Sequence, residues 1–298
     1  MLEKRGTVDP KINKATFSMV HLNVGESLTI DCRVDRYLQV FDTCDALSYE
    51  FLTAASSREE KRRFSRMQKK LILRGNLHSQ VSDPVVDGSL RAAGLAVSVL
   101  IAYRDGPDTY LLLKRRSEKN KAPLHGSMAH VIPSFMLQAE ADDDEVEFSV
   151  THGMYREYLE ELFNVGDERP QMDPRSFYGH AHLRYLRQLL DEGQARFCLT
   201  GVAVNLLNLR PEICTLLLID SEEWWNRHSG RLKEKHRFEL NDEFARDSAE
   251  AEPTWLRRIR YVGTDDRYYR EALQPHCVVP SGAAAFWLGV ETLKDLQI

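Results

Sequence analysis

Cysteine is scarce in this sequence, and long apolar runs are missing. The 298 residues hold five cysteines, none in C-x-x-C spacing, which argues against a disulfide framework and against a cysteine zinc site. No apolar run reaches the roughly 18–20 residues that a membrane span needs, and the N-terminus has no apolar signal region. We therefore expect a cytoplasmic protein without a membrane partner.

An excess of basic charge is also missing. The chain has 40 basic and 45 acidic residues, a net charge of −5, which argues against nucleic acid as a partner. It contains no P-loop, no G-x-S-x-G and no H-E-x-x-H, so the sequence gives no support to a P-loop NTPase, a serine hydrolase or a zinc hydrolase. A hydrophobic content of 43% is typical of a soluble globular protein with one or two domains.

The N-terminal part of the chain predicts strands followed by a basic helix. Two β-like runs, 16–22 and 27–34, flank a turn. A capping box at 57–60 then opens a helix rich in lysine and arginine, which Gly75 would end. This helix is either a solvated surface or a face for phosphate or a partner, and a charge run alone favours the solvated surface.

Further along, the pattern predicts a larger sheet. Two apolar runs, 95–103 and 110–115, flank the turn Asp105-Gly-Pro107 and indicate a β-hairpin. Ser281 can cap a last helix. Because the strands and helices do not alternate regularly, an α+β fold with a mixed sheet is favoured over a doubly wound sheet. The predicted strands are 95–103, 110–115, 129–137, 197–209 and 213–220.

The most informative segment is the predicted helix 154–162. It places Glu157, Glu160 and Glu161 at i, i+3 and i+4 on one arc, opposite an apolar arc. Like charges at this spacing repel, and a hard cation such as Mg²⁺ would turn that repulsion into a binding site. The alternative is a surface helix with an acidic face and an Arg156–Glu160 pair.

Residues 156–161, Arg-Glu-Tyr-Leu-Glu-Glu, resemble the R-E-U-x-E-E centre of a Nudix box, where U is a bulky aliphatic residue. The strand that ends at Lys114-Arg-Arg116 and the segment Val131-Ile-Pro-Ser134 are similar to the surroundings of that box. The resemblance implies a Nudix-like α/β/α sandwich with a mixed sheet at 91–298. Residues 1–90 would then form a smaller N-terminal α/β segment of unknown role.

The resemblance also implies a function. Nudix proteins commonly hydrolyse a diphosphate linkage in nucleoside diphosphate-type compounds and use Mg²⁺ or Mn²⁺. By this resemblance Glu160 and Glu161 would bind the metal. Glu157 would bind metal or act as base, and Arg156 would orient a glutamate. A coordinated water, deprotonated with help from a glutamate, would attack phosphorus.

The first half of the box departs from the family pattern. Phe148 stands where a glutamate is expected, with Glu147 beside it, and the family glycines are replaced. Glu145 and Glu147 could supply the missing metal ligand, although an acidic loop of this kind is more often solvated. A glycine-rich loop approaches substrate closely, so side chains in its place would intrude.

Two further groups of residues have a functional and a structural interpretation. Lys114, Arg115 and Arg116 could bind substrate phosphates, or they could form an exposed strand end. Trp224 and Trp225 could stack on a base, but after a strand it is more usual for one of two adjacent tryptophans to lie in the core.

Three hypotheses follow from these observations. The first is a divergent, metal-dependent Nudix hydrolase acting on a nucleotide-type small molecule, and the intact hexapeptide at 156–161 favours it. The second is a non-catalytic sensor of a nucleotide or related phosphometabolite, with 1–90 transmitting the signal, and the missing glycines favour it. The third is an interaction module built on the same fold. A homodimer is compatible with all three, and the substrate cannot be read from the sequence.

Overall fold

The computed structural model describes residues 13–56, 69–115, 128–138, 148–165, 174–229, 237–239, 256–263 and 265–298. The chain forms two compact units. The first comprises Met1–Ala96, Met136–Ser149 and Val204–Glu212. The second comprises Val97–Phe135, Val150–Ala203 and Ile213–Ile298.

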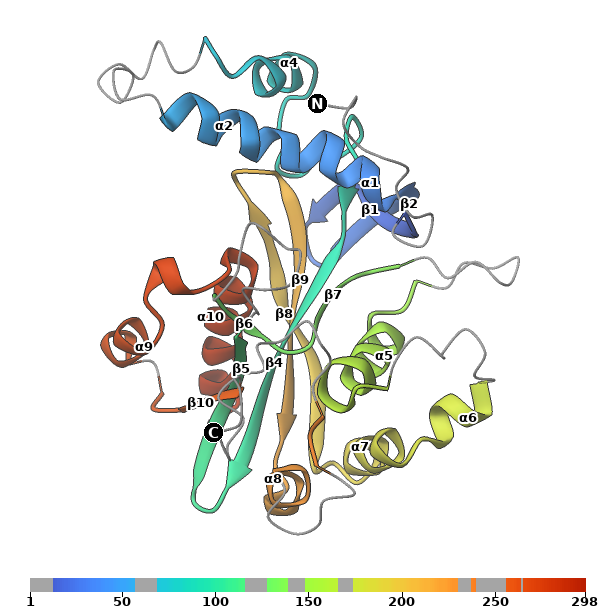
Figure 1. Cartoon of the computed structure of the whole chain (residues 1–298), viewed down its shortest axis with the longest axis vertical. Helices are drawn as coiled ribbons and strands as arrows, with labels where there is room; N and C mark the ends of the chain where they lie inside the picture. Colours follow the sequence, from blue (N-terminus) through green and yellow to red (C-terminus); the bar gives the residue numbers. More distant parts are fainter. Residues whose placement is uncertain are drawn as a thin grey trace. The chain divides into compact units, whose positions relative to one another are not determined.

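A large sheet lies mainly in the second unit, with strand order β10-β5-β4-β9-β8, and with β6 beside β5 and β7 beside β4 (Figure 1). The predicted hairpin is confirmed: β4 and β5 are antiparallel, and Gly106 in their turn has φ of 64°, a conformation that favours glycine. The strands are β4 Ala96–Asp105, β5 Asp108–Arg115, β6 Ala129–Val131, β7 Ser134–Met136, β8 Ala195–Asn205, β9 Arg210–Ile219 and β10 Leu256–Arg260.

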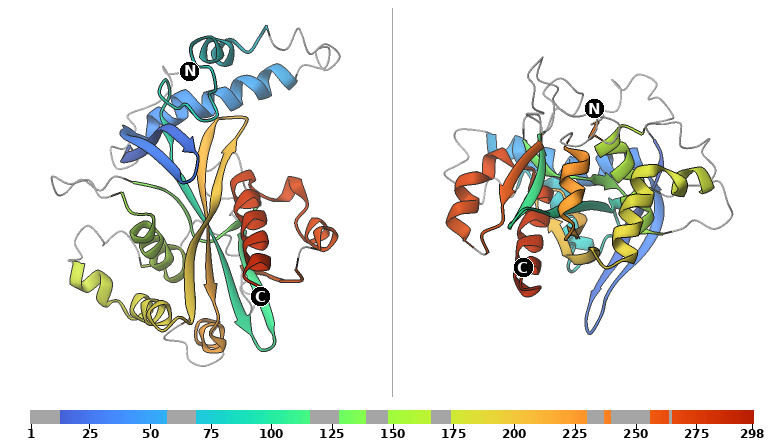
Figure 2. Two further views of the ribbon diagram at one scale, coloured as in Figure 1. Left: turned by 180° about the vertical axis from the view of Figure 1, so that it is seen from behind. Right: turned by 90° about the horizontal axis from the view of Figure 1, so that it is seen from below.

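Helices cover both faces of this sheet. Because side chains alternate along a strand, Leu113 of β5 joins an apolar core with Phe286 of α10, while its neighbour Lys114 reaches Glu161 of α5. Figures 1 and 2 show α5 and α10 on opposite faces. The fold class is therefore α+β, as predicted, with an α/β/α layering. The helices of this unit are α5 Val150–Phe163, α6 Pro174–Gly179, α7 Ala181–Asp191, α8 Glu222–His228, α9 Asp266–Ala272, the 3₁₀ turn η7 Pro275–Cys277 and α10 Pro280–Asp295.

Several predicted boundaries are wrong. Val279 is the N-cap of α10 and Pro280 its first residue, so Ser281 lies inside the helix rather than capping it. Proline suits this first position because its missing N–H would have no partner within the helix. The long strands β8 and β9 are joined at residues 206–209, earlier than predicted, where Leu209 has φ of 57°. Strand β10 is not among the strands predicted from the sequence.

The first unit contains a smaller sheet, β2-β1-β3, and a helical segment. The predicted N-terminal hairpin is confirmed by the antiparallel pairing of β1 and β2. Gly75 lies within α4 and does not end a helix, and the capping box at 57–60 falls outside the described residues. The elements are β1 Ala15–Val24, β2 Leu28–Arg36, α1 Tyr37–Val40, the π-helical turn η3 Phe41–Asp45, α2 Ala46–Ser56, α4 Ile72–Gln80 and β3 Ala93–Gly94.

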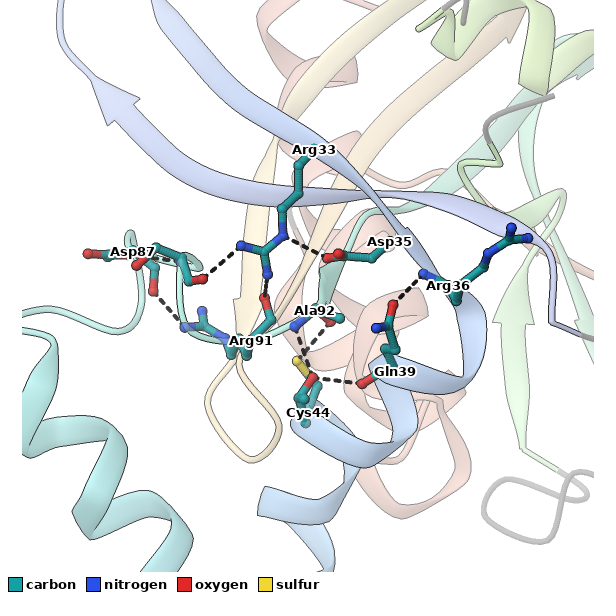
Figure 3. A network of polar contacts seen from close by, with 10 residues as sticks. Arg33, Asp35, Arg36, Gln39, Cys44, Asp87, Arg91 and Ala92 are labelled. Carbon is teal, nitrogen blue, oxygen red and sulfur yellow. Dashed lines mark hydrogen bonds and ion pairs between the residues drawn. The ribbon is translucent and has the colours of Figure 1, made fainter. Parts of the chain in front are cut away.

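Two arginines fix the loop that leads into β3 (Figure 3). Arg33 donates to the carbonyls of Ser89 and Arg91 at 2.7 and 2.9 Å and to the carboxylate of Asp35 at 2.9 Å. Arg91, only 2% exposed, donates to the Asp87 carbonyl at 2.6 Å. These bonds satisfy backbone carbonyls that a buried loop would otherwise leave without partners.

In the part of the chain that the structure describes, no helix is long and apolar enough to cross a membrane.

Candidate functional site

Helix α5 carries the hexapeptide that resembles a Nudix box. Its apolar residues recur at helical spacing, and Met154, Tyr158 and Leu162 are fully buried. Arg156 and Glu161 are buried as well, with exposures of 8% and 3%. The expected division into an apolar and an acidic face is therefore incomplete, and the buried charges need partners.

Glu161 has its partners in Lys114 and Ser134. The Lys114 ammonium group lies 2.8 Å from both carboxylate oxygens of Glu161, and the Lys114 side chain is 1% exposed. The backbone N–H of Ser134, the first residue of β7, donates to Glu161 Oε2 at 3.2 Å. A buried charge pair is tolerated when further hydrogen bonds satisfy the remaining lone pairs, as the Ser134 N–H does here.

Arg156 pairs with the residue next to it. Its Nη2 lies 3.0 Å from Glu157 Oε1, and its Nε donates to the same oxygen at 3.3 Å. The Glu157 side chain is 12% exposed. This contact pairs a second charge on α5 with a charge of opposite sign. The predicted role of Arg156 in orienting a catalytic glutamate stays a prediction.

Of the remaining predicted metal ligands, the structure describes Glu160 alone. Glu160 is partly exposed on α5. Within the described ranges, no three histidine, cysteine, aspartate or glutamate side chains are grouped so that they could hold a metal ion. Glu147, Glu145 and Arg116 lie outside the described residues, so their predicted roles stay predictions.

Lys114 and Arg115 lie on opposite sides of β5. Lys114 is enclosed beneath α5, while Arg115 is exposed. Successive side chains of a strand point to opposite faces, so these two residues do not converge on one ligand group. The position of Lys114 in its strand could have predicted its burial. Lys114 lies two residues after the apolar, buried Leu112 and therefore on the same face of the sheet.

The contacts of Glu161 bear on whether a divalent cation fits these residues. Mg²⁺ on the Glu161 carboxylate would lie within a few ångströms of the Lys114 ammonium group. Two unit charges about 4 Å apart repel by about 4 kcal/mol at an effective dielectric constant near 20, and a divalent ion doubles this. With Lys114 in this position, the described residues do not fit a metal ion bound through Glu161.

Aromatic residues hold α5 in place. Tyr158 accepts a hydrogen bond from Trp224 Nε1 at 3.0 Å, with both side chains fully buried. Trp225, 7% exposed, stacks on Tyr103 with ring centroids 4.7 Å apart. Both tryptophans therefore belong to the core that positions α5, and base stacking by either is not supported.

Comparison with known proteins gives little further information. No protein-family model matches the chain, and no curated protein matches it. Among solved structures, a candidate Nudix hydrolase from Listeria monocytogenes is 12% identical, with a TM-score of 0.29; the match covers 67% of this chain and 94% of that protein.

The position of the missing glutamate has a packing role. Phe148 forms an edge-to-face contact with Phe17 of β1 in the first unit, with ring centroids 5.1 Å apart. Aromatic pairs of this geometry are worth about 0.5–1.5 kcal/mol beyond the area they bury. Phe148 is 44% exposed, so it packs through this one ring contact, at the position where the family pattern has an ionisable side chain.

Proposed function

We propose that this protein is a Nudix-like binding domain that recognises a phosphate-bearing, nucleotide-type ligand and does not hydrolyse it. The observation that carries the proposal is the buried pair of Lys114 and Glu161. It engages both oxygens of the glutamate that hydrolysis would need as a metal ligand. Phe148, which replaces a glutamate of the family pattern, supports the same conclusion.

The ligand class rests on the resemblance of residues 156–161 to the Nudix box, together with one exposed cation. Arg115 is solvent-accessible at the end of β5. A guanidinium group can bind a phosphate through two parallel hydrogen bonds, which fixes its orientation as well as its charge. In this proposal α5 is the scaffold, and its Glu161 and Arg156 pair with Lys114 and Glu157. Arg115 is a contact for the ligand phosphate.

Metal-dependent hydrolysis remains the second candidate, because one observation favours it. The bond from Arg156 to Glu157 is the contact expected if the arginine orients a catalytic glutamate. A divalent ion would supply charge neutralisation of the diphosphate and an activated water. In this second candidate Glu157, held by Arg156, and Glu160 would be the metal ligands, since Glu161 is engaged by Lys114.

A panel of nucleoside diphosphate derivatives separates the two candidates. Each compound is incubated with the wild type and Mg²⁺, and both the melting temperature and the recovered compound are measured. The binding proposal expects at least one compound to raise the melting temperature and to be recovered intact. Mg²⁺-dependent consumption that is lost in Glu160→Gln would instead establish the hydrolase.

The role of Arg115 is tested on whichever compound stabilises the protein. Removing a charge-assisted hydrogen bond costs about 1.5–3 kcal/mol, so Arg115→Ala should weaken binding about 10- to 100-fold. Arg196→Ala, which removes an exposed arginine from β8, is the matched control and should bind normally. If no compound is bound or consumed, both candidates fail and an interaction module remains.

A further inference from the structure

We propose that the Lys114 ammonium group takes the place of a divalent cation on the Glu161 carboxylate of α5. The inference deepens the proposed function and rests on it, since a domain that does not hydrolyse its ligand has no need of a metal-activated water. The Lys114 ammonium group neutralises the carboxylate that a metal ion would otherwise neutralise, so its removal should change the affinity of the site for metal ions.

The geometry of the contact is that of a cation held by both oxygens of one carboxylate. Lys114 Nζ is 2.8 Å from Glu161 Oε1 and 2.8 Å from Oε2. Lysine suits this position because its ammonium group is a compact point charge, whereas the planar guanidinium group of arginine is larger. The Ser134 N–H adds a third donor to the carboxylate at 3.2 Å.

The described residues of the site form two ion pairs. Lys114 and Glu161 form one neutral pair, and Arg156 and Glu157 form another. Glu160, on the same helix, is partly exposed. A divalent ion added at Glu161 would have to overcome the repulsion of the Lys114 ammonium group.

Removing the ammonium group should allow a divalent ion to bind at Glu161. In Lys114→Met the hydrocarbon stem is largely retained, but the Glu161 carboxylate, 3% exposed, loses its cation. A buried carboxylate that loses its paired cation is strongly destabilised, and an oxygen-seeking cation would restore the lost interaction. The inference thus predicts a latent metal site that the variant reveals and the wild type lacks.

The experiment compares Mn²⁺ binding by the wild type and by Lys114→Met. The electron paramagnetic resonance signal of free Mn²⁺ reports binding, and the melting temperature reports stabilisation. We expect no loss of free signal with the wild type. For Lys114→Met we expect loss of about one equivalent and a rise in melting temperature of about 5 °C in saturating Mn²⁺.

Three variants locate the effect. Lys114→Arg keeps a positive charge and should not gain Mn²⁺ binding. Arg196→Met removes an exposed positive charge from β8 and should behave like the wild type. Glu160→Gln in the Lys114→Met background should weaken the gained binding, because it removes a carboxylate one position from Glu161 on the same helix.

Stoichiometric Mn²⁺ binding by the wild type that is lost in Glu161→Gln would overturn the inference. So would a folded Lys114→Met that gains no Mn²⁺ affinity. If that variant does not fold, Lys114→Gln, which keeps a polar side chain, is measured with the same criteria. The Mn²⁺ experiment can fail while the proposed function holds. The proposed function is tested separately, by whether a nucleotide ligand is bound and recovered intact in the presence and in the absence of a chelator.

Discussion

At the scale of single residues, the feature with the largest energetic consequence is the buried pair of Lys114 and Glu161. Each ion loses its hydration on burial, at a cost of several kcal/mol, and the mutual attraction repays this only with good geometry. The two 2.8 Å contacts supply that geometry. Removing both charges should therefore destabilise the folded protein less than removing one of them.

This asymmetry gives a prediction for stability in the absence of metal. Lys114→Met or Glu161→Gln alone should lower the free energy of unfolding by about 3–5 kcal/mol, because each removes one member of a buried ion pair and leaves the other charge buried. The double variant Lys114→Met with Glu161→Leu should recover most of the loss. Urea denaturation measures all three, and equal, additive losses would show that the two residues do not act as a pair.

A second residue, Cys44, makes the stability depend on pH. Burial raises the pKa of its thiol from 9.0 to about 11, and the side chain is fully buried. Its Sγ donates to the Ala92 carbonyl at 3.3 Å (Figure 3). The unfolded chain releases the thiol proton at a lower pH than the folded protein does, so the unfolded state gains free energy from ionisation first.

We therefore expect the stability contributed by Cys44 to be fully present below pH 9 and to be lost as the pH rises towards 11. The loss should be about 2–3 kcal/mol in the free energy of unfolding. Cys44→Ser keeps a hydroxyl for Ala92 and removes the titration, so its unfolding curves should vary less over this range. Parallel pH profiles for the two proteins would contradict the assignment.

At the scale of elements, the loop before β3 approaches β1 so closely that it requires glycine. A Cβ at Gly88 would lie 2.1 Å from the carbonyl oxygen of Met19, a backbone atom that cannot move aside. Gly88 also donates its N–H to the Val20 carbonyl at 2.9 Å. The loop and the strand therefore meet through their backbones.

Gly88→Ala should consequently lower the free energy of unfolding by about 1–3 kcal/mol or more, as overpacking does elsewhere. Gly25, in the turn between β1 and β2, is the matched control, since no atom lies within 4 Å of a Cβ placed there. Gly25→Ala should change stability by no more than about 0.5 kcal/mol. Equal effects of the two substitutions in thermal or urea unfolding would show that the close approach does not govern stability.

At the scale of the whole molecule, the net charge sets the expected behaviour towards polyanions. With 45 acidic and 40 basic residues, the chain should lack the general attraction to phosphate backbones that gives basic proteins affinities of about 10⁻⁴–10⁻⁶ M. Fluorescence anisotropy with labelled duplex and single-stranded DNA should show no binding at micromolar protein. Binding that weakens steeply with salt would instead reveal a local basic surface.

The sequence predicted much of the architecture because local signals were strong. The Asp105-Gly-Pro107 turn between two apolar runs identified the hairpin of β4 and β5, and helical spacing identified α5. Strand β10 was missed because its sequence, Leu-Arg-Arg-Ile-Arg, is mostly charged. It is a strand because its backbone pairs with β5, and local sequence does not record such a long-range pairing.

For the candidate site, the sequence by itself determined which residues α5 brings forward: Arg156, Glu157, Glu160 and Glu161. Only the tertiary structure decided which charges they meet. Lys114 and Glu161 are far apart in the chain, and the register of β5 beneath α5 brings them to 2.8 Å. The physical reason is that helix periodicity is local, whereas the partner of a buried charge depends on which strand packs against it, and here that partner is an ammonium group.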